Sequence, residues 1–402
     1  MASEVLTARG LLHALRPDGG GGFEEAAVEA LNLIRFIAAL GPGSEEIAAQ
    51  LVVAGPPATA ASGAGEGVPT WGSHFAGVLR TGAGDGTGLG NPSFEAEGGY
   101  WALLEAFTDA RCLPPPERQA FFVQFDNAEL TAALLAAISA AQTEAAALAA
   151  RRVVRNLARG PGLRPRLAPA VPALIASLQE GSHARVAASA AALCNVACHM
   201  ETKERAIQSG AVRHLLATLR QVGLPPEAAE DLVACLGVLT GGSQEGIGAV
   251  FEVGAELGEA EAFGAVLRWL PRASGASSPL LCLAMEVLTG ISAASPRFKA
   301  WLVQESPMAS VELPQLLRSD AAAVRMAALQ LATLLLEADG FTDKFQRAEG
   351  VGALQAVLER DSATGRGGGM GQAGLMAPEL GGRREPRESD LAKYLLSKIL
   401  LL

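Results

Sequence analysis

The sequence predicts an all-α fold in which short helices stack into a long superhelical solenoid. Half of the residues are hydrophobic but only 5% are aromatic, and Ala and Leu dominate the apolar positions. Both residues are strong helix formers, and small side chains let helices approach closely. Period-two runs of β-branched and aromatic residues, which are typical of strands, are scarce. The more specific observation is an internal repeat of helix-sized segments.

An apolar helix end recurs five times along the chain. The copies are residues 153–160, 192–199, 235–242, 284–291 and 329–336. They align on Asn156, Asn195, Val238, Val287 and Ala332, and the intervals between these positions are 39, 43, 49 and 45 residues. Solenoid repeats built from two or three helices have a period of ~40–47 residues. The intervals therefore indicate one helical repeat per copy, with one slightly long unit.

A second apolar helix recurs between these helix ends, at residues 170–178, 210–219, 310–317 and 350–358. Within residues 201–219, Gly210 is expected to take a positive φ at the corner between two helices. The combined pattern resembles the armadillo repeat, in which a Gly-Ala-(Ile/Val) step opens a helix that ends in Leu-Leu. The resemblance implies an armadillo-like right-handed superhelix that binds another protein and catalyses no reaction.

The pattern divides the chain into four parts. Residues 100–360 are expected to form the armadillo-like array, and residues 1–99 degenerate N-terminal repeats. Gly/Pro-rich loops at 54–70 and 81–93 interrupt the N-terminal part. The Gly-rich residues 361–387 predict a flexible linker, and residues 388–402 an amphipathic C-terminal helix.

The C-terminal helix is expected to begin at a cap formed by Ser389 or Asp390. Its apolar stripe consists of Leu391, Leu395, Ile399 and Leu402. Three interpretations remain open. The helix docks on its own solenoid, whose end repeat needs a cover, or it inserts into a groove of a partner, or it anchors at a membrane surface.

Charge and composition exclude several classes of protein. The net charge of −10 argues against a nucleic-acid binder, because neutralising phosphates needs a basic surface. No apolar run reaches the ~18–20 residues of a membrane span. Five cysteines, an odd number at low density, indicate reduced thiols and a cytoplasmic location. Residues 1–16 lack a hydrophobic signal core and leave weak organelle targeting as the alternative.

No catalytic or cofactor motif is complete. The Gly-rich residues 82–90 lack the register of a nucleotide-binding loop. Ser243 resembles a nucleophile elbow, but Glu245 occupies the required Gly position, so a turn after a helix is the better interpretation. Cys194, Cys198 and His199 are close enough for zinc, but no second ligand pair follows. Buried free thiols are favoured, and neither a metal nor a cofactor is predicted.

The armadillo resemblance supplies the candidate partner-binding residues. In peptide-binding members an Asn on the third helix of each unit holds the backbone of an extended peptide, and Asn156 and Asn195 match that position. The Trp of nuclear-import members is missing, since Arg152 and Ala191 stand there. Nearby guanidinium groups favour an acidic ligand. The predicted groove residues are Arg151, Arg152, Arg155, Asn156, Asn195 and His199. The alternative is that both Asn side chains tie neighbouring helices together.

These observations favour a non-enzymatic scaffold or adaptor that holds a protein or extended peptide partner on its concave face. The alternative function is a regulator of a nucleotide-bound client, because some armadillo-like proteins are exchange factors for Hsp70 chaperones or small GTPases. No residue pattern selects that second role.

Overall fold

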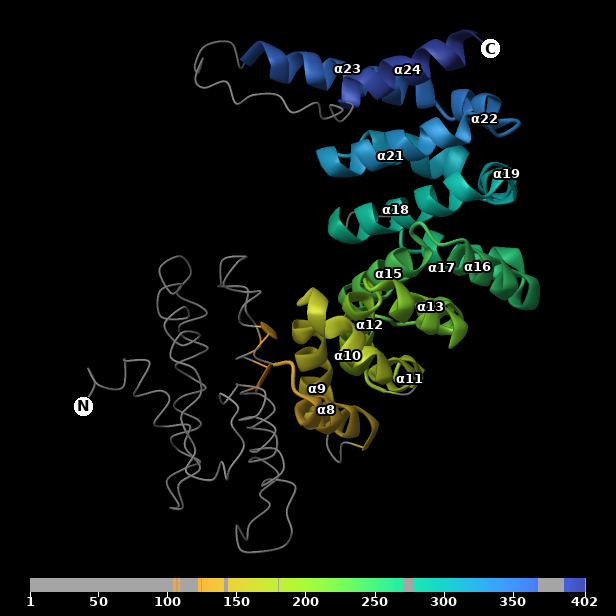
Figure 1. Cartoon of the computed structure of the whole chain (residues 1–402). Helices are drawn as coiled ribbons and strands as arrows, with labels where there is room; N and C mark the ends of the chain where they lie inside the picture. Colours follow the sequence, from red (N-terminus) through yellow and green to blue (C-terminus); the bar gives the residue numbers. More distant parts are fainter. Residues whose placement is uncertain are drawn as a thin grey trace, which may run out of the picture. The chain divides into compact units, whose positions relative to one another are not determined.

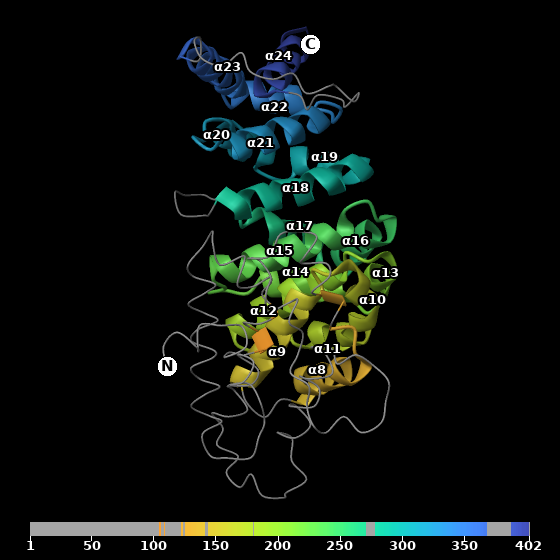
Figure 2. The ribbon, with the colours of Figure 1, turned by 60° about the vertical axis from the view of Figure 1, so that its left-hand side comes forward.

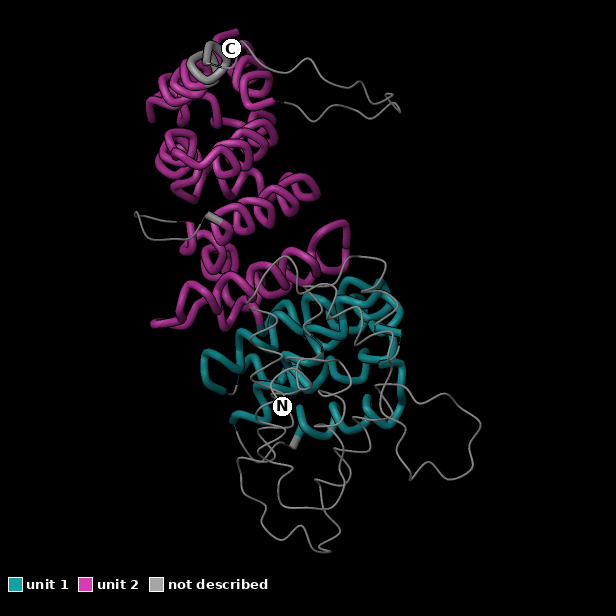
Figure 3. The backbone as a smooth tube through the Cα atoms, turned by 90° about the vertical axis from the view of Figure 1, so that its left-hand side faces the viewer, with its two compact units in different colours: residues 1–214 teal, residues 215–402 magenta. Residues whose placement is uncertain are grey.

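Every regular element in the described part of the chain is a helix, which confirms the all-α prediction (Figures 1 and 2). The computed structural model describes residues 104–105, 108, 122–123, 125–140, 144–179, 181–270, 278–367 and 387–401. The predictions for residues 1–99, with the loops at 54–70 and 81–93, lie outside these residues. The chain separates into two compact units, residues 1–214 and 215–402 (Figure 3).

Unit 1 contains short, proline-interrupted helices between two longer ones. Its helices are α8 (Ala128–Ala140), α9 (Glu144–Leu157), α10 (Arg164–Leu167), α11 (Val171–Ala176), α12 (His183–Val196) and α13 (Met200–Gln208). Pro165 and Pro172 stand in the first turns of α10 and α11, where a missing N–H costs nothing. The longer helices α9 and α12 pack directly against each other.

Unit 2 repeats one three-helix arrangement. Helix α14 (Ala211–Leu219) crosses the unit boundary. The following helices are α15 (Pro226–Thr240), α16 (Gln244–Leu257), α17 (Glu259–Leu267), α18 (Ser278–Ala294), α19 (Pro296–Gln304), the π-helix η4 (Met308–Glu312), α20 (Leu313–Leu317), α21 (Ala322–Leu335), α22 (Phe341–Arg347), α23 (Gly350–Gly367) and α24 (Glu388–Leu401). Each repeat is a first, a second and a third helix, and α15, α18, α21 and α24 are the third helices.

The third helices form a continuous layer within unit 2. α15 packs on α18, α18 on α21, and α21 on α24. A Cβ added to Gly237 of α15 would lie 3.3 Å from Cγ2 of Val287 on α18, so the absent side chain lets these helices approach closely. All five predicted helix ends overlap the C-terminal part of a third helix, α9 and α12 of unit 1 included, which confirms the repeat that they define.

Glycine and serine shape the corners between helices as the sequence predicts. Gly210, between α13 and α14, has a φ of 82°, which confirms its left-handed conformation. Ser243 is the N-cap of α16, and its hydroxyl accepts a hydrogen bond from the Gly246 amide at 3.0 Å. Ser243 therefore starts a helix after a third helix, and the turn interpretation is confirmed.

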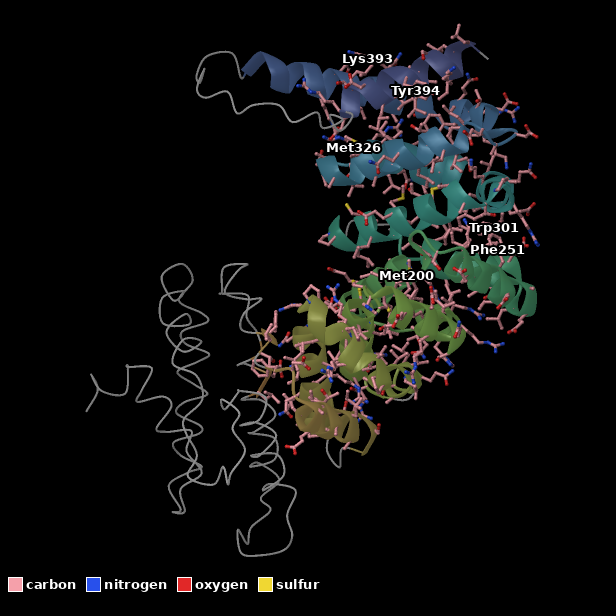
Figure 4. All side chains as sticks on the ribbon, viewed as in Figure 1. Met200, Phe251, Trp301, Met326, Lys393 and Tyr394 are labelled. Carbon is pink, nitrogen blue, oxygen red and sulfur yellow. The ribbon has the colours of Figure 1, made fainter. Side chains whose placement is uncertain are left out.

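An aromatic cluster joins the first and second helices of one repeat to the next. Phe263 of α17 meets Phe251 of α16, with ring centroids 5.4 Å apart, and Trp301 of α19, 5.0 Å away (Figure 4). Both contacts are edge-to-face, the geometry that aromatic quadrupoles favour. This core lies away from the layer of third helices.

Helix α24 is the third helix of the last described repeat rather than a separate element. It packs on α21 and α23, with Leu395 and Ile399 buried and Leu391 half-buried, whereas Leu402 lies outside the described residues. The helix starts at Glu388, so neither predicted cap, Ser389 or Asp390, is its N-cap residue. The Asp390 carboxylate, in the first turn, accepts a hydrogen bond from the Arg387 amide. Docking on its own array is the interpretation that the structure supports.

The predicted boundary at residue 360 is wrong by about two helical turns. Helix α23 continues past Arg360 through Gly367. Among the described helices, none is long and apolar enough to cross a membrane.

Candidate functional site

The third helices α15, α18 and α21 each have one unburied stripe beside a continuous buried face. The stripes recur with helical spacing of three and four residues, so each follows one side of its helix. We define the third-helix face of unit 2 by nine of these residues: Glu227, Ala234 and Val238 of α15, Leu283, Glu286 and Gly290 of α18, and Met326, Gln330 and Thr333 of α21. Figure 4 marks Met326 on α21.

The third-helix face of unit 2 is acidic and partly apolar. Helices α15 and α18 contain the acidic residues Glu227, Glu230, Asp231 and Glu286 and have neither Lys nor Arg. Burial, and then the nearby charge of Glu286, raises the pKa of the Cys282 thiol. A surface that combines carboxylates with half-buried apolar side chains can bind cationic side chains and the aliphatic stems that carry them.

The corresponding face of unit 1 has the opposite charge. Arg152 and Arg155 of α9 are half-buried, and Cys194 and Asn195 of α12 continue the unburied side. The Arg152 guanidinium forms an ion pair with Glu105 at 3.3 Å. Of the six predicted groove residues, four are thus on partly exposed surface: Arg152, Arg155, Asn195 and His199.

Arg151 is an interior residue, and its predicted groove position is wrong. Its side chain is 2% exposed because it faces the helices packed around α9. The guanidinium donates hydrogen bonds to the carbonyls of Ala147 and Ile138, at 2.6 and 3.1 Å, and to the hydroxyls of Ser189 and Ser177, at 2.9 and 2.5 Å. Burial lowers the pKa of Arg151 to about 10, so the group remains charged at neutral pH.

The two matching Asn side chains tie third helices to the preceding segment. Asn195 Nδ2 donates to the Arg155 carbonyl at 2.9 Å, and Asn156 Nδ2 donates to the Glu105 carbonyl at 3.2 Å. Asn156 is 0% exposed, so its prediction as a peptide-binding residue is wrong. The structure therefore favours the alternative in which these amides join neighbouring helices.

Alignment on the Asn positions selects the wrong side of later third helices. Val287 and Ala332, which align with Asn156, are both buried, whereas Val238 is half-buried. One residue turns a helix by 100°, so Glu286 lies on the exposed stripe of α18 although Val287 does not. Sequence reasoning missed Glu286 and Gln330, which the polar residues at helical spacing on α18 and α21 would have revealed.

Cys194, Cys198 and His199 lie near the end of α12. His199 is the residue before α13, and its Nδ1 is 3.4 Å from the Thr202 hydroxyl. The prediction of buried thiols is confirmed for Cys235 and wrong for Cys198, which is exposed. Cys194 and Cys282 are half-buried, and Cys112 lies outside the described residues. The described residues contain no group of three or more His, Cys, Asp or Glu side chains that could hold a metal ion.

Comparison with known proteins identifies the fold. No family model matches the sequence, and no curated protein matches it. An engineered protein solved by a structural genomics consortium aligns with 97% of this chain and 77% of its own, with a TM-score of 0.66 and 18% identity. A designed armadillo repeat protein aligns with 65% of this chain and 99% of its own, with a TM-score of 0.52 and 18% identity.

A second designed armadillo repeat protein was solved in complex with the peptide (KR)4. It aligns with 70% of this chain and 98% of its own length, with a TM-score of 0.50 and 17% identity. At these identities the likeness concerns the fold alone. The chain therefore has an armadillo-like repeat fold, a class of helical repeat fold, and the comparisons identify no particular member of that class.

Proposed function

We propose that this chain is a non-enzymatic scaffold that binds an extended segment of a partner protein along its third helices. The supporting observation is the recurrence of one unburied stripe on α15, α18 and α21, beside buried faces that hold the array together. A repeated stripe offers equivalent contacts at regular intervals, which suits an extended chain better than a compact ligand. The proposed mechanism is binding alone, without a chemical step.

The spacing of the third helices fits an extended segment. Packed helices lie about 8–10 Å apart, and an extended chain advances about 3.3 Å per residue. One repeat therefore corresponds to about three residues of the bound segment. The Gln330 amide can donate to and accept from a peptide group, and the half-buried Leu283 and Val238 supply apolar contact.

Charge selects which side chains each unit accepts. On unit 2 the carboxylates of Glu227 and Glu286 favour Lys or Arg of the bound segment. The armadillo-like structure with the (KR)4 peptide gives a precedent for a basic ligand on this fold. On unit 1 Arg152 and Arg155 favour a carboxylate-bearing segment, as the sequence predicts. Unit 2 is thus proposed to bind basic segments, and unit 1 acidic segments.

Peptide display on the full chain tests this proposal. Random peptides selected on the wild-type protein are measured by fluorescence anisotropy against Glu286→Arg and against Glu252→Arg. Both changes reverse one exposed charge, but Glu286 lies on the third-helix face and Glu252 on the first helix α16. We expect Glu286→Arg to weaken basic peptides at least about tenfold, which corresponds to about 1.4 kcal/mol.

The same design applies to unit 1, with Arg155→Glu on α9 and Arg205→Glu on α13 as the pair. We expect acidic peptides to lose affinity only with Arg155→Glu. The proposal is wrong if Glu252→Arg and Arg205→Glu weaken binding of the selected peptides as much as Glu286→Arg and Arg155→Glu do. It is equally wrong if no peptide selected on the protein responds to either third-helix change.

A further inference from the structure

Helix α24 is joined to its array through a much longer connection than the other third helices of unit 2. Residues 368–387 separate it from α23, whereas residues 318–321 separate α20 from α21 and residues 268–277 separate α17 from α18. α24 also fully buries fewer side chains: Ala392, Leu395 and Ile399, against seven residues of α21. The helix is therefore held by a small contact surface at the end of a long tether.

Two polar contacts fix the position of α24 at its two ends. At its start the Arg325 guanidinium of α21 binds Glu388 in a bidentate pair, with Nε–Oε2 at 2.9 Å and Nη2–Oε1 at 3.3 Å. The two side chains are only 12% and 17% exposed. Near its end the Gln346 amide donates to the Ile399 carbonyl at 3.0 Å. Together with three buried apolar side chains, these contacts specify one helix in one register.

We propose that the surface of α21 and α23 beneath α24 is a helix-binding site that also accepts α24 from a second copy of this chain, so that two copies exchange this helix when the intramolecular contact is weakened. Every contact of α24 described above is the same whether the helix comes from its own chain or from another. The connecting residues span up to about 65 Å when extended, at about 3.3 Å per residue, which is ample for exchange. The site is separate from the third-helix face and does not depend on the proposed peptide binding.

The tether determines which form prevails. A connection of about 20 residues holds its helix at an effective concentration in the millimolar range. Wild-type chains at micromolar concentration therefore keep their own helix, and exchange needs a bias against the intramolecular contact. The charged pair of Arg325 and Glu388 supplies a means to impose that bias.

A charge-reversal pair tests the exchange in the full chain. Arg325→Glu and Glu388→Arg each place like charges together within one molecule. In an equimolar mixture of these two variants, reciprocal exchange restores one native and one reversed pair. Size-exclusion chromatography with light scattering, and native mass spectrometry, report the heterodimer.

The expected concentration follows from the strength of the pair. If each disrupted charged pair weakens intramolecular docking about thirtyfold, restoring two pairs favours exchange about a thousandfold. That factor offsets a millimolar effective concentration, so the heterodimer should half-form near about 1 µM and dominate at about 20 µM. Each variant alone should stay monomeric there and melt about 3–8 °C lower than wild type.

The double variant Arg325→Glu/Glu388→Arg is the matched control. It restores a reversed pair within one chain, so it should be monomeric and recover most of the melting temperature; the bonds from Arg325 to the Ser319 and Asp320 carbonyls remain lost. A mixture that stays monomeric at 100 µM, about a hundred times the expected midpoint, overturns the proposal. A double variant that melts no higher than the single variants also overturns it.

Discussion

Replacing Arg151 by Ala removes the buried guanidinium that links four helices of unit 1. Its hydrogen bonds reach Ile138 of α8, Ala147 of its own helix, Ser177 after α11 and Ser189 of α12. Hydrogen bonds to a charged group are worth about 1.5–3 kcal/mol each but are not additive, and truncating a large buried side chain costs about 2–5 kcal/mol. We expect Arg151→Ala to lower the free energy of unfolding of unit 1 by about 3 kcal/mol.

Hydrogen exchange of the α9 and α12 amides measures this loss locally. Where these amides exchange from the unfolded state at equilibrium, a loss of about 3 kcal/mol in unfolding free energy speeds their exchange about a hundredfold. The adjacent change Arg152→Ala is the control, because its side chain is 41% exposed and its ion pair with Glu105 contributes at most about 1 kcal/mol. Equal exchange rates in the two variants would refute the structural role of Arg151.

The pH dependence of this effect has a definite sign. Because the pKa of Arg151 is lowered to about 10, the group is charged in both folded and unfolded chains from pH 6 to 9. The difference in unfolding free energy between wild type and Arg151→Ala should therefore be constant over this range. Above pH 10 the folded state releases its proton first. The contribution of Arg151 to the unfolding free energy should therefore rise with pH, and a fall would contradict the burial argument.

Two further predictions concern α16 and α14. Gly246→Ala should lower the unfolding free energy by about 3 kcal/mol, because the new Cβ would lie 2.1 Å from the Leu239 carbonyl oxygen. At Gly248 a new Cβ would meet nothing within 4 Å, so Gly248→Ala should raise the unfolding free energy by up to about 1 kcal/mol. Urea unfolding measures both changes. Burial and the charge of Arg213 lower the pKa of His214 below 6.5. The contribution of neutral His214 to the unfolding free energy is therefore fully present above pH 6.5 and is lost as the pH falls through the lowered pKa. His214→Gln should reduce the loss between pH 7 and 5, and an unchanged slope would contradict this.

The repeat architecture is predictable because its signals are local. Apolar residues at helical spacing, and Gly210 at a corner, depend on single helices and turns, so one sequence contains them. The position of α24 is harder to predict from the sequence. Its stripe predicts an amphipathic helix, but pairing with Arg325 is a contact across 63 residues that no local pattern specifies.

The candidate site is only partly predictable for a related reason. Three Arg residues in five positions of α9 predict a basic surface, yet Arg151 turns inward because packed helices surround that side of α9. Asn156 is buried by the segment that contains Glu105. Helical periodicity predicts which residues share a side of the helix. It does not predict which of these sides other helices cover, so the sequence pattern alone does not identify the polar residues that face solvent.

Thiol labelling of Cys282 tests peptide binding along the third helices most directly. This native cysteine is half-buried on α18 and close to Glu286. A saturating basic peptide selected on the wild-type protein should slow its alkylation at least about tenfold, because the bound chain covers the stripe. A cysteine introduced by Glu252→Cys on α16 should react at an unchanged rate. Protection of the α16 thiol with full reactivity at Cys282 would contradict the account.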